Sequence, residues 1–315
     1  MKNERVARIC EMKNWDGRAS VRSSSHSYGF PSNIGEELKQ KDWFLRSALP
    51  FMTHPAILDA GENSIKRFLA RYLIFFLDYT TSLEHKIVNR SVEVVVHDEL
   101  YLDVPYALKK AGFQLYTDEG YHALIAASVA EDVKIFYEFE AGYAPIKRIN
   151  NLQQLIHLDP EKSKLAALIV GFVSETSITQ ELLEVASKSL VSPAYNMLRD
   201  HLMDECKHSK YFSTVFNFAW CRLSDSLKDF TADFLIRVIF EFFRMDESWL
   251  INNLLEEGVD LSAVLDINFE RQTKSAHVSR AKSGSRATIA VLNTIGFFGY
   301  KNNYRLFKKA GLIDG

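Results

Sequence analysis

The chain has 315 residues, of which 47% are hydrophobic and 25% are charged, a balance that gives a globular protein a sizeable core. Its net charge of -2 and its scattered lysines and arginines argue against nucleic acid as a partner. The charged first residues and the lack of a long apolar run predict neither a leader peptide nor a membrane span, so we expect a cytoplasmic protein. Cys10, Cys206 and Cys221 show no C-x-x-C spacing, which indicates neither a disulfide framework nor a thiolate metal site.

The N-terminal residues 1–32 predict an irregular arm, and residues 33–315 predict a single helical domain. The arm is rich in serine, glycine and histidine without an apolar period, and His26 among its serines is interpreted as a solvated residue. After the arm, short helices broken at Pro50 and Pro55 are expected.

The first long helix is predicted to begin near Asn63 or Ser64, which are good N-cap residues, and to run uninterrupted towards Val96. Glu84 falls in register with apolar residues such as Leu77, so its carboxylate shares the stripe that faces the core. An unpaired buried charge is costly, and we infer that a metal ion is its partner.

A second helix is predicted to have Pro105 in its first turn and to end at about Asp132. It carries Glu119 and His122, which together form a Glu-x-x-His motif. Gly120 lies beside these candidate ligands, and a tolerated helical glycine is the preferred interpretation over local unwinding.

The polar stretch 138–159 is expected to be a long connection, as a bundle needs where two helices run in the same sense. Asp159 and Pro160 then mark the start of a third helix, which carries Glu175 on an apolar stripe. Gly171 lies one turn before Glu175, and it would either leave room for a substrate or dioxygen or allow a neighbouring helix to pack closely.

A fourth helix is predicted from Ser192 past Trp220. Within it, His201, Glu205 and His208 stand at positions i, i+4 and i+7, which places all three side chains on one face. A carboxylate and two imidazoles on one helix face form half of a site for a transition metal.

The C-terminal third of the chain predicts further helices around the four long ones. We expect an amphipathic helix at 227–243, a short helix at 249–256, a loop or lid at 268–286, and closing helices at 287–298 and 304–310. Nothing in the sequence resembles a nucleotide-binding or hydrolase motif.

The candidate ligands follow the order Glu, Glu-x-x-His, Glu, Glu-x-x-His, with one additional histidine. They are Glu84, Glu119, His122, Glu175, His201, Glu205 and His208. This is the ligand order of ferritin-like dimetal carboxylate bundles. The sequence therefore predicts an all-α protein, a ferritin-like four-helix bundle with additional helices and a dimetal carboxylate site in its core, which the resemblance described next makes a diiron site. A single Glu-x-x-His motif could arise by chance. The alternative interpretation of these residues is that they form ordinary salt bridges and solvated helix faces rather than a metal site.

At these seven positions the sequence resembles the dinuclear iron arylamine N-oxygenases, the family of the p-aminobenzoate N-oxygenase of aureothin biosynthesis. The distinguishing feature is the histidine one turn before the last Glu-x-x-His, which His201 matches. The resemblance covers roughly residues 60 to 215. It implies that Glu84 and His122 are terminal ligands of one iron, that Glu175, His201 and His208 hold the other, and that Glu119 and Glu205 bridge them.

The resemblance also implies an activity. The protein would use dioxygen as a co-substrate and two iron ions to convert an amine, an arylamine in the best-known members, to a hydroxylamine, nitroso or nitro compound. Glu119, Glu205 and His201 would be the catalytic residues. The resemblance further implies a homodimer and a role in secondary-metabolite or antibiotic biosynthesis. Because the sequence has no flavin or nicotinamide motif, electrons would come from an external donor such as a reductase or ferredoxin.

Two other classes remain open. One is a diiron enzyme of the same fold that hydroxylates or desaturates carbon, and the other is a non-catalytic metal-binding bundle or helical interaction protein. The substrate is also open, since aryl and aliphatic amines are not distinguished. Arg71 and Arg90 could bind a substrate carboxylate, but ordinary surface ion pairs explain them equally well.

Overall fold

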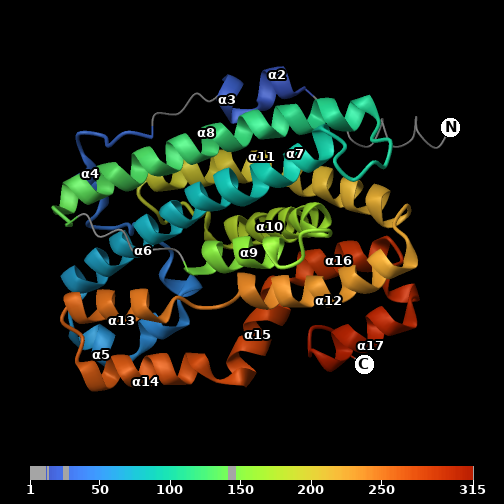
Figure 1. Ribbon diagram of the computed structural model, residues 1–315. Coiled ribbons are helices and arrows are strands. Elements are labelled where there is room, and N and C mark those ends of the chain that lie inside the picture. The colour runs from blue at the N-terminus through green and yellow to red at the C-terminus, as the bar shows by residue number, and fades with distance from the viewer. Residues whose placement is uncertain (1–11, 13, 24–27, 141–146, 315) are drawn as a thin grey trace.

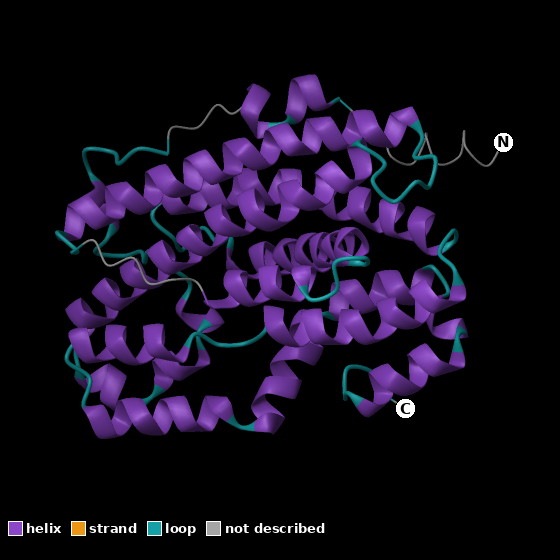
Figure 2. Ribbon diagram, viewed as in Figure 1, coloured by secondary structure: helices purple, strands orange, loops and turns teal. Residues whose placement is uncertain are grey.

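The computed structural model describes residues 12, 14–23, 28–140 and 147–314, and these form helices joined by short loops (Figure 1). No strand occurs among them, and Asp42 and Leu190 form the only isolated bridge between extended segments that the described residues contain (Figure 2). The predicted all-α class is confirmed. Cys10 and His26 lie outside the described residues, so the interpretations given to them stay predictions.

Four long helical segments lie side by side as a bundle (Figure 1). They are α6 (Glu62–Leu83), which continues through η3 (Glu84–Val88) into α7 (Asn89–Val96), α8 (Tyr106–Tyr137), α10 (Ser163–Val185) and α11 (Ser192–Trp220). Helix α10 packs on α11, α6 packs on α8, and α7 contacts both α8 and α10. The four-helix bundle is therefore the one that the sequence predicts.

The first bundle segment differs from the predicted uninterrupted helix at one turn. At Glu84 the α-helical pattern changes to a single π-helical turn, η3, before α7 resumes. Such a turn carries i to i+5 hydrogen bonds and occurs frequently at functional sites. The π turn contains no glycine or proline, and its residues are ones that an α-helix also accepts. The sequence pattern therefore does not predict it.

The two glycines near the candidate ligands have different roles. A Cβ atom added at Gly171 would lie 2.2 Å from Ser91 Oγ and 2.9 Å from the ring of Phe212. Gly171 therefore allows α7 and α11 to approach α10 closely, which decides between the two interpretations of this glycine in favour of helix packing. A Cβ atom at Gly120 would meet no heavy atom within 4 Å, so a tolerated helical glycine is confirmed there.

Two apolar clusters fill the bundle, one on each side of a polar layer. One cluster contains side chains such as Phe172, Phe212 and Phe216, and the other contains Phe68 and Leu69. Each long helical segment contributes apolar residues to both clusters and its candidate ligands to the layer between them. The candidate ligands are thus enclosed in the middle of the bundle, where water is largely excluded.

The remaining helices surround the bundle (Figure 1). They are α9 (Lys147–His157), α12 (Asp225–Phe242), α13 (Glu247–Glu256), α14 (Leu261–Gln272), α15 (Lys274–Gly284), α16 (Arg286–Thr294), η4 (Phe297–Gly299) and α17 (Lys301–Lys309). The helices predicted near 227–243, 249–256, 287–298 and 304–310 are all present.

The predicted long connection at 138–159 is present but contains a helix, and the predicted loop or lid at 268–286 is wrong. The stretch 138–159 contains α9, whose Ile149, Leu152 and Ile156 are buried on one face. The stretch 268–286 is the end of α14 and all of α15 rather than a loop or lid. Helix α15 was not predicted because its many lysines and serines leave few apolar residues. It packs against α12, and the side chain of Thr273 caps its N-terminus.

Shorter segments precede the bundle. They are α2 (Trp15–Arg18), α3 (Ser20–Ser23), α4 (Ile34–Glu37), η1 (Arg46–Ala48), η2 (Pro50–Thr53) and α5 (Pro55–Asp59). Pro50 and Pro55 begin short helices, as a proline at the first helical position does. The predicted irregular arm contains α2 and α3, and α3 lies against α8 and α11.

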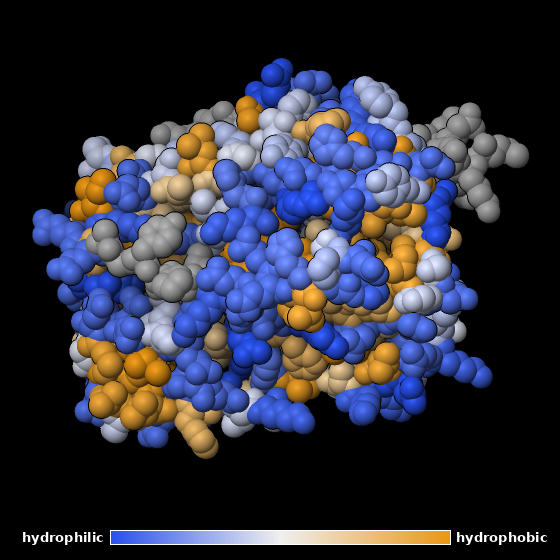
Figure 3. Space-filling view, in the orientation of Figure 1, coloured by the Kyte–Doolittle hydropathy of each residue, from blue (hydrophilic) through white to orange (hydrophobic). Residues whose placement is uncertain are grey.

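The surface is mostly hydrophilic in the view of Figure 3. A hydrophobic area at the lower left lies over α5, α13 and α14, whose exposed apolar side chains are Leu58, Leu255, Leu261, Leu265 and Phe269. None of the described helices combines the length and the apolar character needed to cross a membrane.

Candidate metal centre

All seven predicted ligands meet in the polar layer of the bundle. Glu84 comes from the π turn, Glu119 and His122 come from α8, Glu175 comes from α10, and His201, Glu205 and His208 come from α11. Each has a relative exposure of 3% or less. Carboxylates and imidazoles this deeply buried need a compensating charge or a metal ion.

His201 lies at one side of the centre. Its Nε2 atom is 3.0 Å from Glu84 Oε1 and 3.2 Å from Glu205 Oε1. The ring centroids of His122 and His201 are 4.2 Å apart. The structure thus places His201 beside Glu84 and His122, whereas the family resemblance grouped it with Glu175 and His208. The assignment of ligands to individual metal ions stays a prediction.

His208 lies at the other side. Its Nδ1 atom is 2.8 Å from Glu119 Oε1, 3.0 Å from Glu205 Oε1 and 3.8 Å from Glu175 Oε2. The Nδ1 atom of His122 lies between the two sides, 3.6 Å from Glu119 Oε2 and 3.4 Å from Glu205 Oε1. Glu205 therefore touches all three imidazoles and stands at the middle of the centre.

The geometry fits a pair of metal ions. Two overlapping groups have ligand atoms that all lie within 4.8 Å of one another, and they are Glu84, His122, His201 and Glu205, and Glu119, His122, Glu205 and His208. Several buried atoms of this centre lie close to one another without the geometry of a hydrogen bond, so among the described residues they have no hydrogen-bond partner. They are Glu84 Oε2, both Glu119 oxygens, His122 Nδ1, Glu175 Oε2, His201 Nε2 and Glu205 Oε2. Buried polar atoms are normally satisfied, so their unused lone pairs indicate metal ligation.

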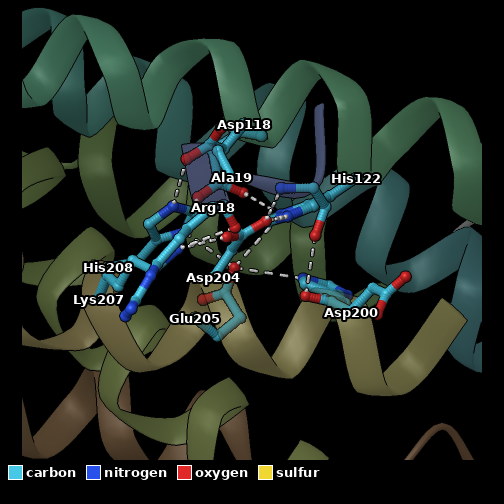
Figure 4. A network of polar contacts seen from close by, with 12 residues as sticks. Arg18, Ala19, Asp118, His122, Asp200, Asp204, Glu205, Lys207 and His208 are labelled. Carbon is cyan, nitrogen blue, oxygen red and sulfur yellow. Dashed lines mark hydrogen bonds and ion pairs between the residues drawn. The ribbon is translucent and has the colours of Figure 1, made fainter. Parts of the chain in front are cut away.

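Two aspartates that the sequence interpretation missed hold the imidazoles from behind. Asp118 Oδ2 lies 3.2 Å from Nε2 of His208, and Asp204 Oδ2 lies 3.4 Å from Nε2 of His122 (Figure 4). Each aspartate thus contacts the histidine of the opposite helix. A carboxylate on the far ring nitrogen of a metal-binding histidine fixes its tautomer and orientation. The signal was present, since both motifs read Asp-Glu-x-x-His.

The acid–base properties of the centre follow from burial and from close opposite charges. Burial raises the pKa of Glu84 to about 7 and raises that of Glu175 well above its ordinary value. Burial alone would lower the pKa of His208, but the charge of Glu205 and other acidic neighbours raise it well above its ordinary value. The pKa of His122 is also raised, because hydrogen bonds to acidic groups outweigh its burial. Without metal, protons therefore occupy part of the ligand set.

Metal loading should displace these protons. Addition of ferrous iron under anaerobic conditions near pH 7 is expected to release protons, and metal affinity should weaken as the pH falls, since a raised pKa keeps a nitrogen protonated. A pH indicator in weakly buffered solution measures the release. The exposed His97 provides the control, because His97→Gln should release the same number. Metal uptake with no proton release and no pH dependence would contradict this electrostatic description.

Arg71 and Arg90, the two arginines considered earlier for substrate binding, form ion pairs away from the centre. Arg71 pairs with Glu256 and Glu257, and Arg90 pairs with Glu99 through two hydrogen bonds. The ordinary ion-pair interpretation is therefore confirmed for both.

Comparison with known proteins agrees with this centre. A search of curated proteins found no match. Residues 23–283, which contain all seven candidate ligands, match the family described as P-aminobenzoate N-oxygenase AurF. This is the family that the ligand pattern resembles, and its members have a ferritin-like diiron fold. The chain belongs to the p-aminobenzoate N-oxygenase AurF family.

Proposed function

We propose that this protein is a dinuclear iron N-oxygenase that uses dioxygen to oxidise the nitrogen of an amine, and that its substrates are arylamines. The product would be a hydroxylamine, or a nitroso or nitro compound after further oxidation. The observation that carries the proposal is the buried set of four carboxylates and three imidazoles in a chain of this family.

The ligand set suits two ferrous ions by charge. Four carboxylates neutralise two divalent ions, and three neutral imidazoles add ligand strength without adding charge, which makes a closed apolar site tolerable. Two ferrous ions bound there would supply the electrons and open positions that dioxygen activation requires. Glu119, Glu205 and His201 would be among the residues that hold the ions, and Glu205 is the carboxylate that contacts all three imidazoles.

A cavity beside the centre suits a single aromatic ring. Its volume is about 140 Å³, and a cavity of about 150 Å³ is large enough to bind benzene. Leu83 and Ser174 line it, and they are the chain neighbours of Glu84 and Glu175. The buried hydroxyl groups of Ser174 and Ser177 have no hydrogen-bond partner among the described residues, so both could orient a polar group of a substrate.

The far wall of this cavity is basic and supports a substrate with an acidic group. Four arginines line the cavity, and they are Arg148, Arg244, Arg271 and Arg280. Arg244 pairs with Glu241, and Glu181 is the single acidic residue among the described residues of the lining. Arg280 donates to the carbonyl oxygen of Arg271 rather than to a carboxylate. Burial lowers the pKa of both Arg271 and Arg280, because it disfavours the charged guanidinium. A bound carboxylate would stabilise these charged groups.

Other parts of the proposal do not come from the geometry of the site. A homodimer and a role in secondary-metabolite biosynthesis rest on the family resemblance, and a cytoplasmic location rests on the sequence composition. An external electron donor is also part of the proposal. The donor is needed because the sequence contains no recognisable flavin or nicotinamide motif.

A panel of paired amines tests the activity and the substrate class together. The iron-loaded protein, supplied with dioxygen and a chemical reductant, should convert p-aminobenzoate to products with one or two additional oxygen atoms. Mass spectrometry would identify them, since the nitroso and nitro products also lose two hydrogens. Aniline, which lacks the carboxylate, should require a higher concentration by roughly tenfold or more, because it cannot pair with the cavity arginines.

The panel also contains aliphatic amines and saturated fatty acids. Oxygen incorporation into carbon, with no reaction of any amine, would replace the proposal by the carbon hydroxylase or desaturase alternative. Oxidation of aniline and p-aminobenzoate with equal KM would retain the N-oxygenase and remove the carboxylate-binding role of the arginines.

A further inference from the structure

The N-terminal segment Trp15 to Ser20 contacts both aspartates that stand behind the metal-site histidines. The indole Nε1 of Trp15 donates to both carboxylate oxygens of Asp118, each at 2.9 Å. The backbone N–H of Ser20 donates to Asp204 Oδ2 at 2.9 Å, and the Ser20 hydroxyl donates to the carbonyl oxygen of Asp200 at 3.2 Å. Figure 4 draws Arg18 and Ala19 of this segment between Asp118 and Asp204.

These bonds complete two parallel chains of contacts. One runs from Trp15 through Asp118 to His208, and the other runs from Ser20 through Asp204 to His122. Each carboxylate is held between a donor from the N-terminal segment and an imidazole whose other nitrogen faces the centre. A group that fixes the carboxylate also fixes the ring, and outer contacts of this kind affect metal affinity strongly.

The two chains of contacts differ in strength. Asp204 also accepts a bond from Lys207 Nζ at 2.9 Å, so it keeps one donor if the Ser20 bond is lost. For Asp118, the contacts that the structure shows are those from Trp15 and His208. The loss of the Trp15 bond should therefore disturb the centre more than the loss of the Ser20 bond.

We propose that the segment Trp15–Ser20 is a positioning element of the metal centre, in which the Trp15 indole and the Ser20 backbone N–H orient Asp118 and Asp204 and thereby His208 and His122. The family match begins at residue 23, so this element belongs to the part of the chain outside it. The inference rests on the metal centre of the proposed function, but it does not depend on which substrate is oxidised.

Two variants remove one donor each. Trp15→Phe keeps an aromatic ring and deletes the indole N–H. Its control is Trp43→Phe, which deletes the N–H that bonds to the hydroxyl of Tyr137 at 2.9 Å and leaves the centre untouched.

Ser20→Pro deletes the second donor. Ser20 is the first residue of α3, a position that tolerates proline, and Ala19 before it has φ -69° and ψ 138°, which suits a residue that precedes proline. Its control is Ser20→Ala, which removes the hydroxyl and keeps the N–H.

The readout is metal binding rather than turnover. Ferrous ions would be withdrawn from the full-length protein by a competing chelator, and the visible spectrum of the cobalt-substituted protein would report the ligand geometry. We expect Trp15→Phe to weaken retention of iron by roughly tenfold, the lower end for outer contacts of metal ligands, and to shift the cobalt spectrum. Ser20→Pro should weaken it by a smaller factor, and both controls should match the parent protein.

Several results would overturn the inference. If Trp15→Phe retains iron as well as Trp43→Phe does, with the same cobalt spectrum, the segment does not position the centre. If Ser20→Ala weakens binding as much as Ser20→Pro does, the hydroxyl rather than the N–H is responsible. A parent protein that binds two metal ions but oxidises no amine would contradict the proposed function and leave the positioning role standing. A parent protein that binds no metal would contradict both.

Discussion

The variant Glu205→Ala should lose both metal loading and amine oxidation, the largest functional effect that we expect from a single substitution. Oε1 of Glu205 lies 3.4 Å from Nδ1 of His122, 3.2 Å from Nε2 of His201 and 3.0 Å from Nδ1 of His208. No other described carboxylate contacts all three imidazoles. Its removal would take away the carboxylate that contacts every imidazole of the centre, and both metal ions would lose a ligand.

Metal content per chain and product formation measure this effect. Metal bound after anaerobic loading should fall from two ions to fewer than one, and product should fall to the level without protein. Glu184→Ala is the matched control, because Glu184 is an exposed glutamate that pairs with Arg286. Circular dichroism of each variant would confirm that the helices persist. Two firmly bound ions in Glu205→Ala would show that Glu205 does not bridge the centre.

Gly171→Ala is expected to have the largest effect on stability among single methyl additions near the centre. The new Cβ atom would lie 2.2 Å from Ser91 Oγ and 2.5 Å from Ser91 Cβ, and both residues are fully buried. To relieve this overlap, α7 and α10 must move apart, and overpacking of a core typically costs about 1–3 kcal/mol.

Gly120→Ala provides the opposite case. Its Cβ atom meets nothing within 4 Å, so an alanine should stabilise α8 by about 0.5–1 kcal/mol through helix propensity alone. Urea unfolding of the metal-free variants measures both changes without a contribution from bound metal. Equal effects of the same sign would mean that the close approach of α7 and α10 is not what Gly171 provides.

The meeting of the seven candidate ligands in the core could be predicted from the sequence because each is a charged or imidazole side chain at helical spacing on an otherwise apolar face. The same pattern predicted the bundle, since helices of this length need a partner for that face. It also contained Asp118 and Asp204 as the first residue of each Asp-Glu-x-x-His. Their crossed contacts to His208 and His122 depend on how α8 and α11 pack, and one helix alone does not determine that.

Other features left no trace in the sequence. The Ser20 bond to Asp204 comes from a backbone N–H, which every residue except proline possesses, so no residue type marks it. The π turn at Glu84 occurs in an ordinary helical sequence. The basic wall of the cavity combines α9, α14 and α15. Two of these helices lie in polar stretches for which no helix was predicted, α9 in the predicted long connection and α15 in the predicted loop or lid.

The contacts of Trp15 and Ser20 have a consequence for the order in which a newly synthesised chain matures. The Trp15 bond to Asp118 spans 103 residues, and the Ser20 bond to Asp204 spans 184. Asp118 lies on α8 and Asp204 lies on α11, so the segment cannot make both bonds until both helices have formed, and closing so long a loop carries an entropic penalty. Orientation of His208 and His122 by this segment therefore follows the packing of α8 and α11, and it is a late step in the assembly of the centre.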